Sequence, residues 1–199
     1  MAFENIIIRR ATPHDARPFH ELLLMSAPFY TTLFGHDSER VLTSMFRHKR
    51  NLFSYEHTLA AESGGELAGM LLCYDYVAKQ SESIPTALAL FRELKSDMLL
   101  KLPVLISYYS VMDIVRKGDF YLNNLAVYPE HRGKHIATSL ISAAGDEAKC
   151  EKAVRLTLEA EKENIDAVRL YEKLGFSTYA ETRVRVLGDT NFLRMSKPL

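Results

Sequence analysis

The chain has 199 residues, 47% of them hydrophobic, and its 25 basic and 25 acidic side chains give a formal net charge of zero. A domain of this length buries roughly 70% of its unfolded surface, so we expect a single domain over residues 1–199 that needs neither a metal nor a disulfide to fold. A neutral charge balance offers no general attraction for nucleic acid or for an anionic membrane, and we predict neither as a partner.

The N-terminus, the cysteines and the histidines give no indication of secretion, of a disulfide or of a metal site. The apolar run within residues 1–10 is too short for a signal peptide, so we expect a cytoplasmic location. Cys73 and Cys150 lie in ordinary strand or helix patterns and are expected to be structural thiols. His131 and His135 form the one close histidine pair, but His131 precedes a glycine turn, and we predict no metal site.

The first third of the chain predicts strands and helices with clear end signals. Thr12 is a suitable helix N-cap, and Pro13 suits the first helical position. Gly64 and Gly65 separate two strand-like runs and supply the positive φ angles of a hairpin turn. The expected elements are a strand at 3–9, helices at 14–26 and 38–50, and strands at 58–62 and 67–74.

Residues 77–117 are expected to form a helical insertion before the next strand. Pro85 and Pro103 are suited to begin one helix each. Lys101, Pro103 and Asp113 interrupt the apolar stretch, so it does not provide the roughly twenty apolar residues of a membrane span. The insertion is open to three interpretations: a lid on an acceptor site, a contact in a homodimer, or an enlarged core.

The last third alternates regularly between strands and helices. Gly175 is suited to cap a helix in the left-handed conformation, and Gly188 with Asp189 separates two final strands. The expected elements are strands at 120–127 and 154–160, helices at 134–149 and 165–174, and a pair of strands at 176–187 and 191–195.

The segment 125–138 has the features of a phosphate-binding loop. An apolar strand ends at Pro129, and a basic loop with Gly133 then opens a helix. The start of a helix has free backbone N–H groups and a partial positive charge, so these groups, with Arg132 and Lys134, are able to enclose a pyrophosphate. This pattern alone predicts an anion site.

A second segment makes the prediction more specific. Residues 132–137 read Arg-Gly-Lys-His-Ile-Ala, close to the pattern Arg/Gln-x-x-Gly-x-Gly/Ala, and about thirty residues later comes Asn-x-x-Ala-x-x-x-Tyr-x-x-x-Gly-Phe. The second pattern is formed by Asn164, Ala167, Tyr171, Gly175 and Phe176. In order and separation the two segments resemble the GCN5-related N-acetyltransferase (GNAT) superfamily, over about residues 119–180. One departure is His135, which stands where that superfamily usually has glycine.

The resemblance implies a fold, a cofactor and a set of binding residues. The implied fold is α/β (α+β): a mixed, mostly antiparallel, splayed sheet of about seven strands, flanked by helices and carrying the insertion at 77–117. The implied acyl donor is acetyl-CoA, bound by strand backbone, by the loop and by the second segment. The cofactor-binding residues implied are Leu125, Ala126, Val127, Arg132, Gly133, Lys134, His135, Ile136, Ala137, Thr138, Asn164 and Tyr171.

Three residues are candidates for the chemistry. By the resemblance, Tyr171 is the general acid for the departing thiolate, and its alternative is a packing tyrosine. Glu159 stands where one branch of the superfamily, the ribosomal-protein alanine N-acetyltransferases, has a base that acts through water; its alternatives are a surface charge or a cofactor-positioning group. Asn124 is a candidate to orient the acceptor or a water molecule, or else a structural strand amide.

These features predict an acyl-CoA-dependent N-acyltransferase that moves acetyl to a primary amine by direct attack in a ternary complex. The acceptor is expected to be a small molecule or a protein N-terminus, and the sequence does not distinguish them. The alternative, motivated by His135 and the insertion, is a non-catalytic acyl-CoA-binding or regulatory module with the same fold.

Overall fold

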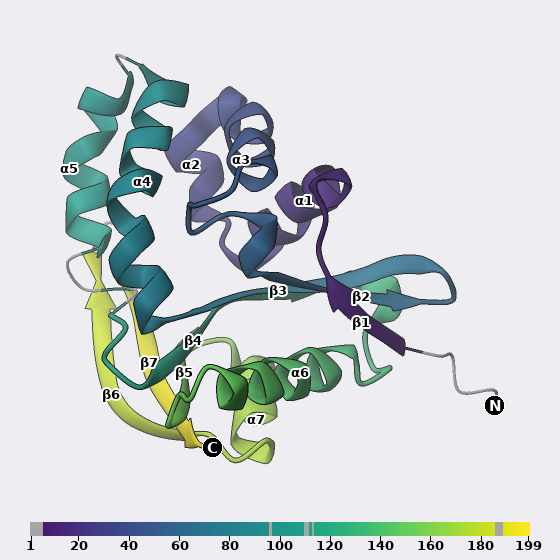
Figure 1. The fold of residues 1–199 in the computed structure, drawn as a ribbon. Coiled ribbons are helices and arrows are strands. Elements are labelled where there is room, and N and C mark those ends of the chain that lie inside the picture. The colour runs from purple at the N-terminus through teal and green to yellow at the C-terminus, as the bar shows by residue number, and fades with distance from the viewer. Residues whose placement is uncertain (1–5, 96, 110–111, 113, 186–188) are drawn as a thin grey trace.

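One mixed sheet runs through the molecule, and its strands follow the order β1-β2-β3-β4-β5-β7-β6 (Figure 1). This computed structural model describes residues 6–95, 97–109, 112, 114–185 and 189–199. Neighbouring strands are antiparallel, except for the parallel pair β4 and β5. The strands are β1 (Ile6–Arg10), β2 (Thr58–Ser63), β3 (Glu66–Asp75), β4 (Asp119–Val127), β5 (Arg155–Glu161), β6 (Ser177–Val184) and β7 (Thr190–Pro198).

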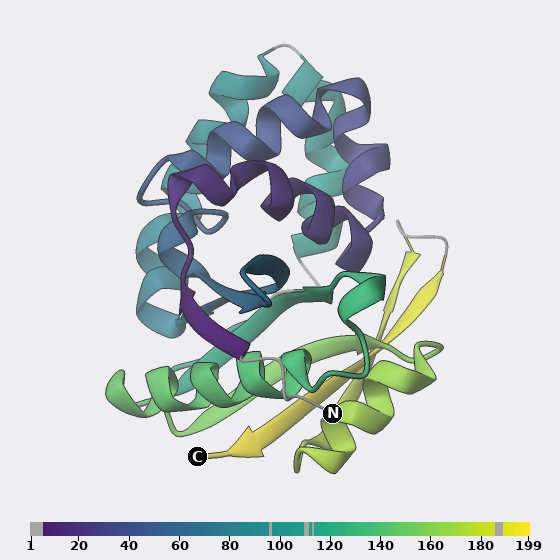
Figure 2. The ribbon, with the colours of Figure 1, turned by 90° about the vertical axis from the view of Figure 1, so that its right-hand side faces the viewer.

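Helices cover both faces of this sheet (Figures 1 and 2). One face carries α1 (Ala16–Ser26), α2 (Phe29–Phe34), α3 (Ser38–Arg47), α4 (Tyr76–Leu94) and α5 (Asp97–Tyr109), and the other carries α6 (Ile136–Cys150) and α7 (Ile165–Lys173). Short 3₁₀ turns are η1 (Pro13–Asp15), η2 (Gly35–Asp37), η3 (Tyr55–His57) and η4 (Pro129–His131). The expected mixed sheet with helices on both faces is confirmed.

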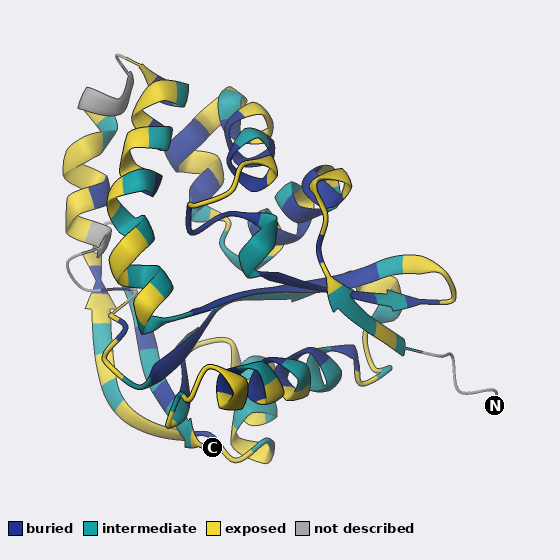
Figure 3. Cartoon of the chain, in the orientation of Figure 1, coloured by how far each residue is buried: buried dark blue, intermediate teal, exposed yellow. Residues whose placement is uncertain are grey.

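Each helical layer has its own apolar core against the sheet (Figure 3). The first core joins α1, α2 and α3 to β3, and it extends into the insertion through Leu90 and Leu94 of α4 and Leu105 of α5. The second joins α6 to the opposite face, where Leu140 is fully buried. The insertion is therefore part of the core and not an appended arm.

The sheet opens between its two parallel strands. β4 and β5 pair only from Asp119–Arg155 to Leu122–Leu158, although β4 continues to Val127 and β5 to Glu161. In the same region β4 carries a bulge, because Leu72 of β3 pairs with Asn124 and the next residue pairs with Leu122, which leaves Asn123 as an extra residue. The divergence leaves one backbone edge of residues 123–127 without its β5 partner.

Several end signals act as the sequence predicts. Gly64 and Gly65 have φ angles of 64° and 85° in the β2–β3 hairpin, and Gly175 has φ 89° after α7. Asp15 accepts hydrogen bonds from the backbone N–H and the hydroxyl of Thr12, at 2.7 and 3.0 Å, which fixes the start of the first helical segment. Residues 3–5 of the first expected strand, residues 186–187 of the expected strand 176–187, and Gly188 of the expected turn lie outside the described residues.

The prediction that Pro85 and Pro103 begin helices is wrong, because both lie inside α4 and α5. The actual start of α4 is set by Asp75, whose carboxylate accepts a hydrogen bond from the N–H of Ala78 at 2.8 Å. A proline inside a helix removes one backbone hydrogen bond, and the core contacts of Leu90 offset this loss. In the described part of the chain, no helix combines the length and apolarity that crossing a bilayer requires.

Candidate active site

A cavity of about 230 Å³ lies at the start of α6 and is termed the loop cavity here. Most of its lining comes from the segment between β4 and the first turn of α6, and α7 contributes Leu170. The lining residues are Val127, His131, Arg132, Gly133, His135, Ile136, Ala137, Thr138 and Leu170. The loop predicted to bind phosphate therefore forms a concave site.

The backbone of this loop turns through two left-handed residues. Gly133 has φ 76°, and His135 has φ 62° and ψ 14° at the N-cap of α6. The helix therefore begins at Ile136, two residues later than the pattern predicts, and the N–H groups of its first turn are left for a ligand. A glycine adopts this conformation without strain, which is a physical reason for glycine at position 135, whereas histidine retains its exposed ring and its N–H there.

The strand that leads to the loop exposes backbone and buries side chains. Leu125 and Val127 pack against the second core, and Ala126 packs against the first. Arg132 folds back so that its Nε donates to the carbonyl oxygen of Val127 at 3.3 Å. The open edge of β4 and the loop cavity are thus continuous along the chain.

A second cavity, of about 570 Å³, lies where β4 and β5 diverge, and we term it the acceptor pocket after the acceptor site that the resemblance leads us to expect. Its lining comes from five separate parts of the chain: the α1–α2 region, α5 with Met112, β4, β5 and β7. The lining residues are Ser26, Ala27, Pro28, Phe29, Thr32, Leu33, Leu100, Lys101, Val104, Met112, Tyr121, Asn123, Asn124, Glu159, Glu161, Thr190 and Phe192.

Glu159 is held on this lining by a tyrosine and an arginine. Its Oε2 accepts a hydrogen bond from the hydroxyl of Tyr121 at 2.7 Å, and its Oε1 accepts one from Nε of Arg194 at 3.0 Å. The Glu159 side chain is 5% exposed and that of Arg194 is 14% exposed. A carboxylate at this depth requires such partners, so the surface-charge interpretation of Glu159 is wrong.

The bulge in β4 brings two neighbouring amides to the same pocket. In a regular strand, residues 123 and 124 point to opposite faces, but both Asn123 and Asn124 line the acceptor pocket here. Asn123 donates to the hydroxyl of Tyr74 at 3.2 Å, and Asn124 donates to Oγ of Ser26 at 3.2 Å. The buried Oδ1 of Asn124 has no hydrogen-bond partner among the described residues.

Tyr171 lies on α7 beside Leu170 of the loop cavity. Its ring packs edge-on against Phe176, with centroids 5.8 Å apart, and burial raises the pKa of its phenol to about 12. It is not among the residues lining either cavity, and the packing role expected as its alternative is present. The phenol is therefore a protonated donor at every ordinary assay pH.

The family model that describes the acetyltransferase (GNAT) family matches residues 19–176. The chain belongs to this family. The match begins within α1 and includes α2–α5, the divergent strands, the loop cavity and α7, so the insertion lies within the GNAT region.

Relatives and solved structures are consistent with this membership. The chain is 43% identical over 65 residues to the uncharacterized N-acetyltransferase YobR of Bacillus subtilis (strain 168), covering 33% of this chain and 26% of YobR. It is 38% identical over 74 residues to N-alpha-acetyltransferase 30 of Schizosaccharomyces pombe (strain 972 / ATCC 24843), covering 37% of this chain and 49% of that protein. The matched segments thus span half or less of the length of these curated relatives.

Similarity at the level of the fold extends further. A crystal structure of an acetyltransferase superposes with a TM-score of 0.72 at 20% identity, over 96% of this chain and 98% of that one. This identity is low, so the comparison shows a shared fold and does not extend to the substrates of that protein. The GNAT fold expected from the two motifs is confirmed.

The structure sorts the predicted GNAT site residues into three groups. Glu159 and Asn124 share the acceptor pocket. Val127, Arg132, Gly133, His135, Ile136, Ala137 and Thr138 line the loop cavity. Leu125, Ala126, Lys134, Asn164 and Tyr171 line neither of these two cavities. Asn164 caps α7, where its Oδ1 accepts from the N–H of Ala167 at 3.2 Å.

Sequence reasoning missed Tyr121 and Arg194, the two partners of Glu159. Tyr121 lies two positions before Asn123 on β4, so strand alternation offered a signal for it. Arg194 pairs with Glu159 through the β5–β7 register, and no local pattern in the sequence specifies that register.

Proposed function

We propose that this protein transfers acetyl from acetyl-CoA to a primary amine by direct attack in a ternary complex. The observation that carries the proposal is the buried Glu159–Tyr121 pair in the acceptor pocket, which shares no lining residue with the loop cavity. A GNAT protein with two such pockets has separate places for donor and acceptor. Direct transfer needs both to be bound at once.

On the donor side, we propose that the N–H groups at the start of α6, together with Arg132 and Lys134, bind the pyrophosphate of acetyl-CoA. The free edge of residues 125–127 pairs with the pantetheine arm in the manner of an added strand. Asn164, at the N-terminal end of α7, also contributes to binding of acetyl-CoA. His135 contributes its backbone N–H to the pyrophosphate site. Its ring is exposed, so the N–H is kept for the ligand.

On the acceptor side, Glu159 is the base and Tyr121 relays the proton. The ammonium form of the acceptor gives a proton to the Tyr121 oxygen while the Tyr121 hydroxyl gives its own to Glu159, which later releases it to solvent. The nitrogen lone pair then attacks the thioester carbonyl carbon. Asn124 orients the acceptor.

The tetrahedral intermediate collapses as its carbon–sulfur bond breaks. Tyr171 donates to the departing thiolate, and the second proton lost by the nitrogen restores the phenol, so the products are an amide, CoA thiol and one released proton. Burial raises the pKa of the Tyr171 phenol to about 12, so the phenol holds its proton until the thiolate departs.

Calorimetry and thiol release test this proposal together. We expect acetyl-CoA to bind and CoA thiol to be released only when an amine is added. Absence of binding at millimolar acetyl-CoA contradicts the proposal. Binding without amine-dependent release identifies a non-catalytic acyl-CoA-binding module.

The relay is tested separately with Tyr121→Phe, which removes only a hydroxyl. We expect kcat to fall about 10²-fold, in the range for lost proton transfer, with the Kd of acetyl-CoA unchanged. Tyr55→Phe is the matched control, since Tyr55 lies on η3 and lines neither cavity. A kcat for Tyr121→Phe equal to that of the control removes Tyr121 from the mechanism.

A further inference from the structure

The insertion supplies one wall of the acceptor pocket. Leu100, Lys101 and Val104 lie at positions i, i+1 and i+4 of α5, and they face the pocket together with Met112. Across from them stand apolar side chains of two other elements, Phe29 and Leu33 of α2 and Phe192 of β7. The pocket therefore has apolar walls above a polar floor formed by β4 and β5.

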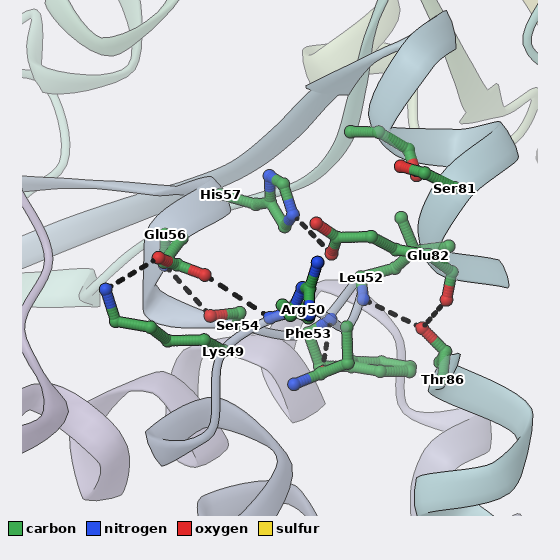
Figure 4. Close-up of polar contacts among 12 residues, drawn as sticks. Lys49, Arg50, Leu52, Phe53, Ser54, Glu56, His57, Ser81, Glu82 and Thr86 are labelled. Atoms are coloured by element: carbon green, nitrogen blue, oxygen red, sulfur yellow. Dashed lines mark hydrogen bonds and ion pairs between the residues drawn. The ribbon is translucent and has the colours of Figure 1, made fainter. Parts of the chain in front are cut away.

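The α4 helix that supports this wall is bonded to the body of the protein in its middle and near its C-terminal end. Figure 4 shows the first set: His57 of η3 contacts the carboxylate of Glu82 at 2.8 Å, and Thr86 accepts from the N–H of Leu52 at 2.9 Å. Farther along, Glu93 accepts from Arg40 of α3 at 2.7 Å.

The second helix is held through the core. Leu105 of α5 is buried in the same apolar core as Leu90 and Leu94 of α4. A wall anchored in this way keeps its shape before a ligand arrives, which lowers the entropy lost on binding.

The charges of the pocket are too few for a polycationic ligand. Among the described lining residues, the ionisable acids and bases that carry charge at neutral pH are Lys101, Glu159 and Glu161. Glu159 is already paired with Arg194, and Lys101 opposes Glu161 in sign. A ligand with several ammonium groups needs several carboxylates, whereas a single amine needs one base.

From these features we propose that the acceptor is a monoamine whose primary amino group is attached close to one bulky apolar group, aromatic or branched. This inference rests on the proposed acetyl transfer and narrows its acceptor. The amine meets Tyr121 and Glu159 on the floor, and the apolar group fills the space between Val104 and Phe192. Two sources present this chemistry: a free hydrophobic amine, or the N-terminus of a peptide that begins with a bulky apolar residue.

Matched acceptors test the proposal with the whole 199-residue chain. The panel is phenethylamine, ethylamine, spermidine and a short peptide beginning with phenylalanine, each assayed by thiol release from acetyl-CoA. Burying an aromatic side chain predicts a kcat/KM for phenethylamine or the peptide at least about 20-fold above that for ethylamine. If the peptide is the better of these two, the apolar group belongs to a protein N-terminus; if phenethylamine is better, it belongs to a free amine.

A pair of variants ties the preference to the wall. Val104 is 39% exposed, so Val104→Glu adds a charge to the pocket without filling a buried core. We expect it to lower kcat/KM for the preferred apolar acceptor about 10-fold, mainly through KM, with the Kd of acetyl-CoA unchanged. The control is Ile84→Glu on α4, which is 72% exposed at its site and lines neither cavity.

The possible outcomes distinguish failure of this inference from failure of the proposed acetyl transfer on which it rests. Release that is fastest with spermidine, or equal for ethylamine and phenethylamine, overturns the apolar-monoamine proposal while leaving acetyl transfer intact. Equal effects of Val104→Glu and Ile84→Glu also overturn it. No release with any amine contradicts the acetyl transfer itself.

Discussion

The loop cavity and the acceptor pocket differ in how the chain builds them. Apart from Leu170, the loop cavity is lined by residues of one segment, 127–138, that are close in sequence. The acceptor pocket collects residues from position 26 to position 192. A site made of neighbouring residues keeps a recognisable local pattern, while a site assembled by topology has none. The loop cavity was therefore predictable as one segment, whereas Glu159 and Asn124 were the predicted site residues in the acceptor pocket and the rest of its lining required the fold.

The largest expected effect is on the acceptor side, at Glu159. Glu159→Gln keeps the shape of the side chain and removes the base, so we expect kcat to fall about 10³-fold. The affinity for acetyl-CoA should not change, because the loop cavity is separate. Rates and calorimetry of the variant check both parts.

Glu181→Gln is the control for this change, since Glu181 forms an exposed ion pair with Lys162 on the surface. Loss of a folded thermal transition in Glu159→Gln would assign the loss of rate to unfolding, because Arg194 loses its carboxylate partner. A folded variant with the rate of Glu181→Gln contradicts the role of the base.

A smaller loss is expected from Tyr171→Phe, at the proposed general acid on α7. Removing the phenol should lower kcat about 10²-fold and leave the Kd of acetyl-CoA unchanged, the scale for one lost general acid. Tyr55→Phe again serves as the control.

The burial of Tyr171 also predicts how the rate depends on pH. Because burial raises the pKa of Tyr171 to about 12, its proton stays in place throughout an ordinary assay range. The wild-type rate should therefore show no alkaline decline from this group up to about pH 10. An alkaline decline near pH 9 that disappears in Tyr171→Phe would contradict the buried, protonated phenol.

On the donor side alone, Arg132→Ala should weaken acetyl-CoA binding about 10-fold, the cost of one lost charged contact with phosphate. The value of kcat at saturating donor should be little changed. Arg17→Ala is the comparison, because the Arg17 side chain is 77% exposed on α1 and lies outside both cavities. Equal Kd values for the two variants would remove Arg132 from the pyrophosphate site.

The smallest effect is expected at His135. His135→Gly and His135→Ala both remove the ring, but only glycine adopts φ 62° without strain. We therefore expect the free energy of unfolding of the glycine variant to exceed that of the alanine variant by about 1 kcal/mol. Both should bind acetyl-CoA within about threefold of the wild type, because each keeps the backbone N–H. A 10-fold change in affinity in either variant would show that the ring contacts the donor.

Much of the fold follows from local signals in the sequence. The Gly64–Gly65 hairpin, the left-handed Gly175 and the cap at Thr12 specify ends that the structure has at those positions. The expectation that Pro85 and Pro103 begin helices was wrong, because burial and the Asp75 cap outweigh the cost of a proline in a helix. The α6 helix begins two residues later than expected, because no distinctive sequence signal indicates that His135 is left-handed.

Within the site, the sequence predicts residue types better than their partners. Glu159 was named from the resemblance alone, and its burial depends on Tyr121 and Arg194 of two other strands. The positions of Asn123 and Asn124 on one pocket depend on a bulge, which is a property of strand pairing. Pairing across a sheet is a long-range property, and this is why the partners of Glu159 and the shared pocket of the two asparagines were not predictable.

The most direct test of the account is to incubate the protein with carbon-13-labelled acetyl-CoA and an amine, and to measure the acetylated amine and the free CoA by mass spectrometry. The account predicts one labelled amide for each CoA released, and about 10³-fold slower formation of both with Glu159→Gln. Release of CoA without labelled amide, or no reaction with any amine, contradicts it.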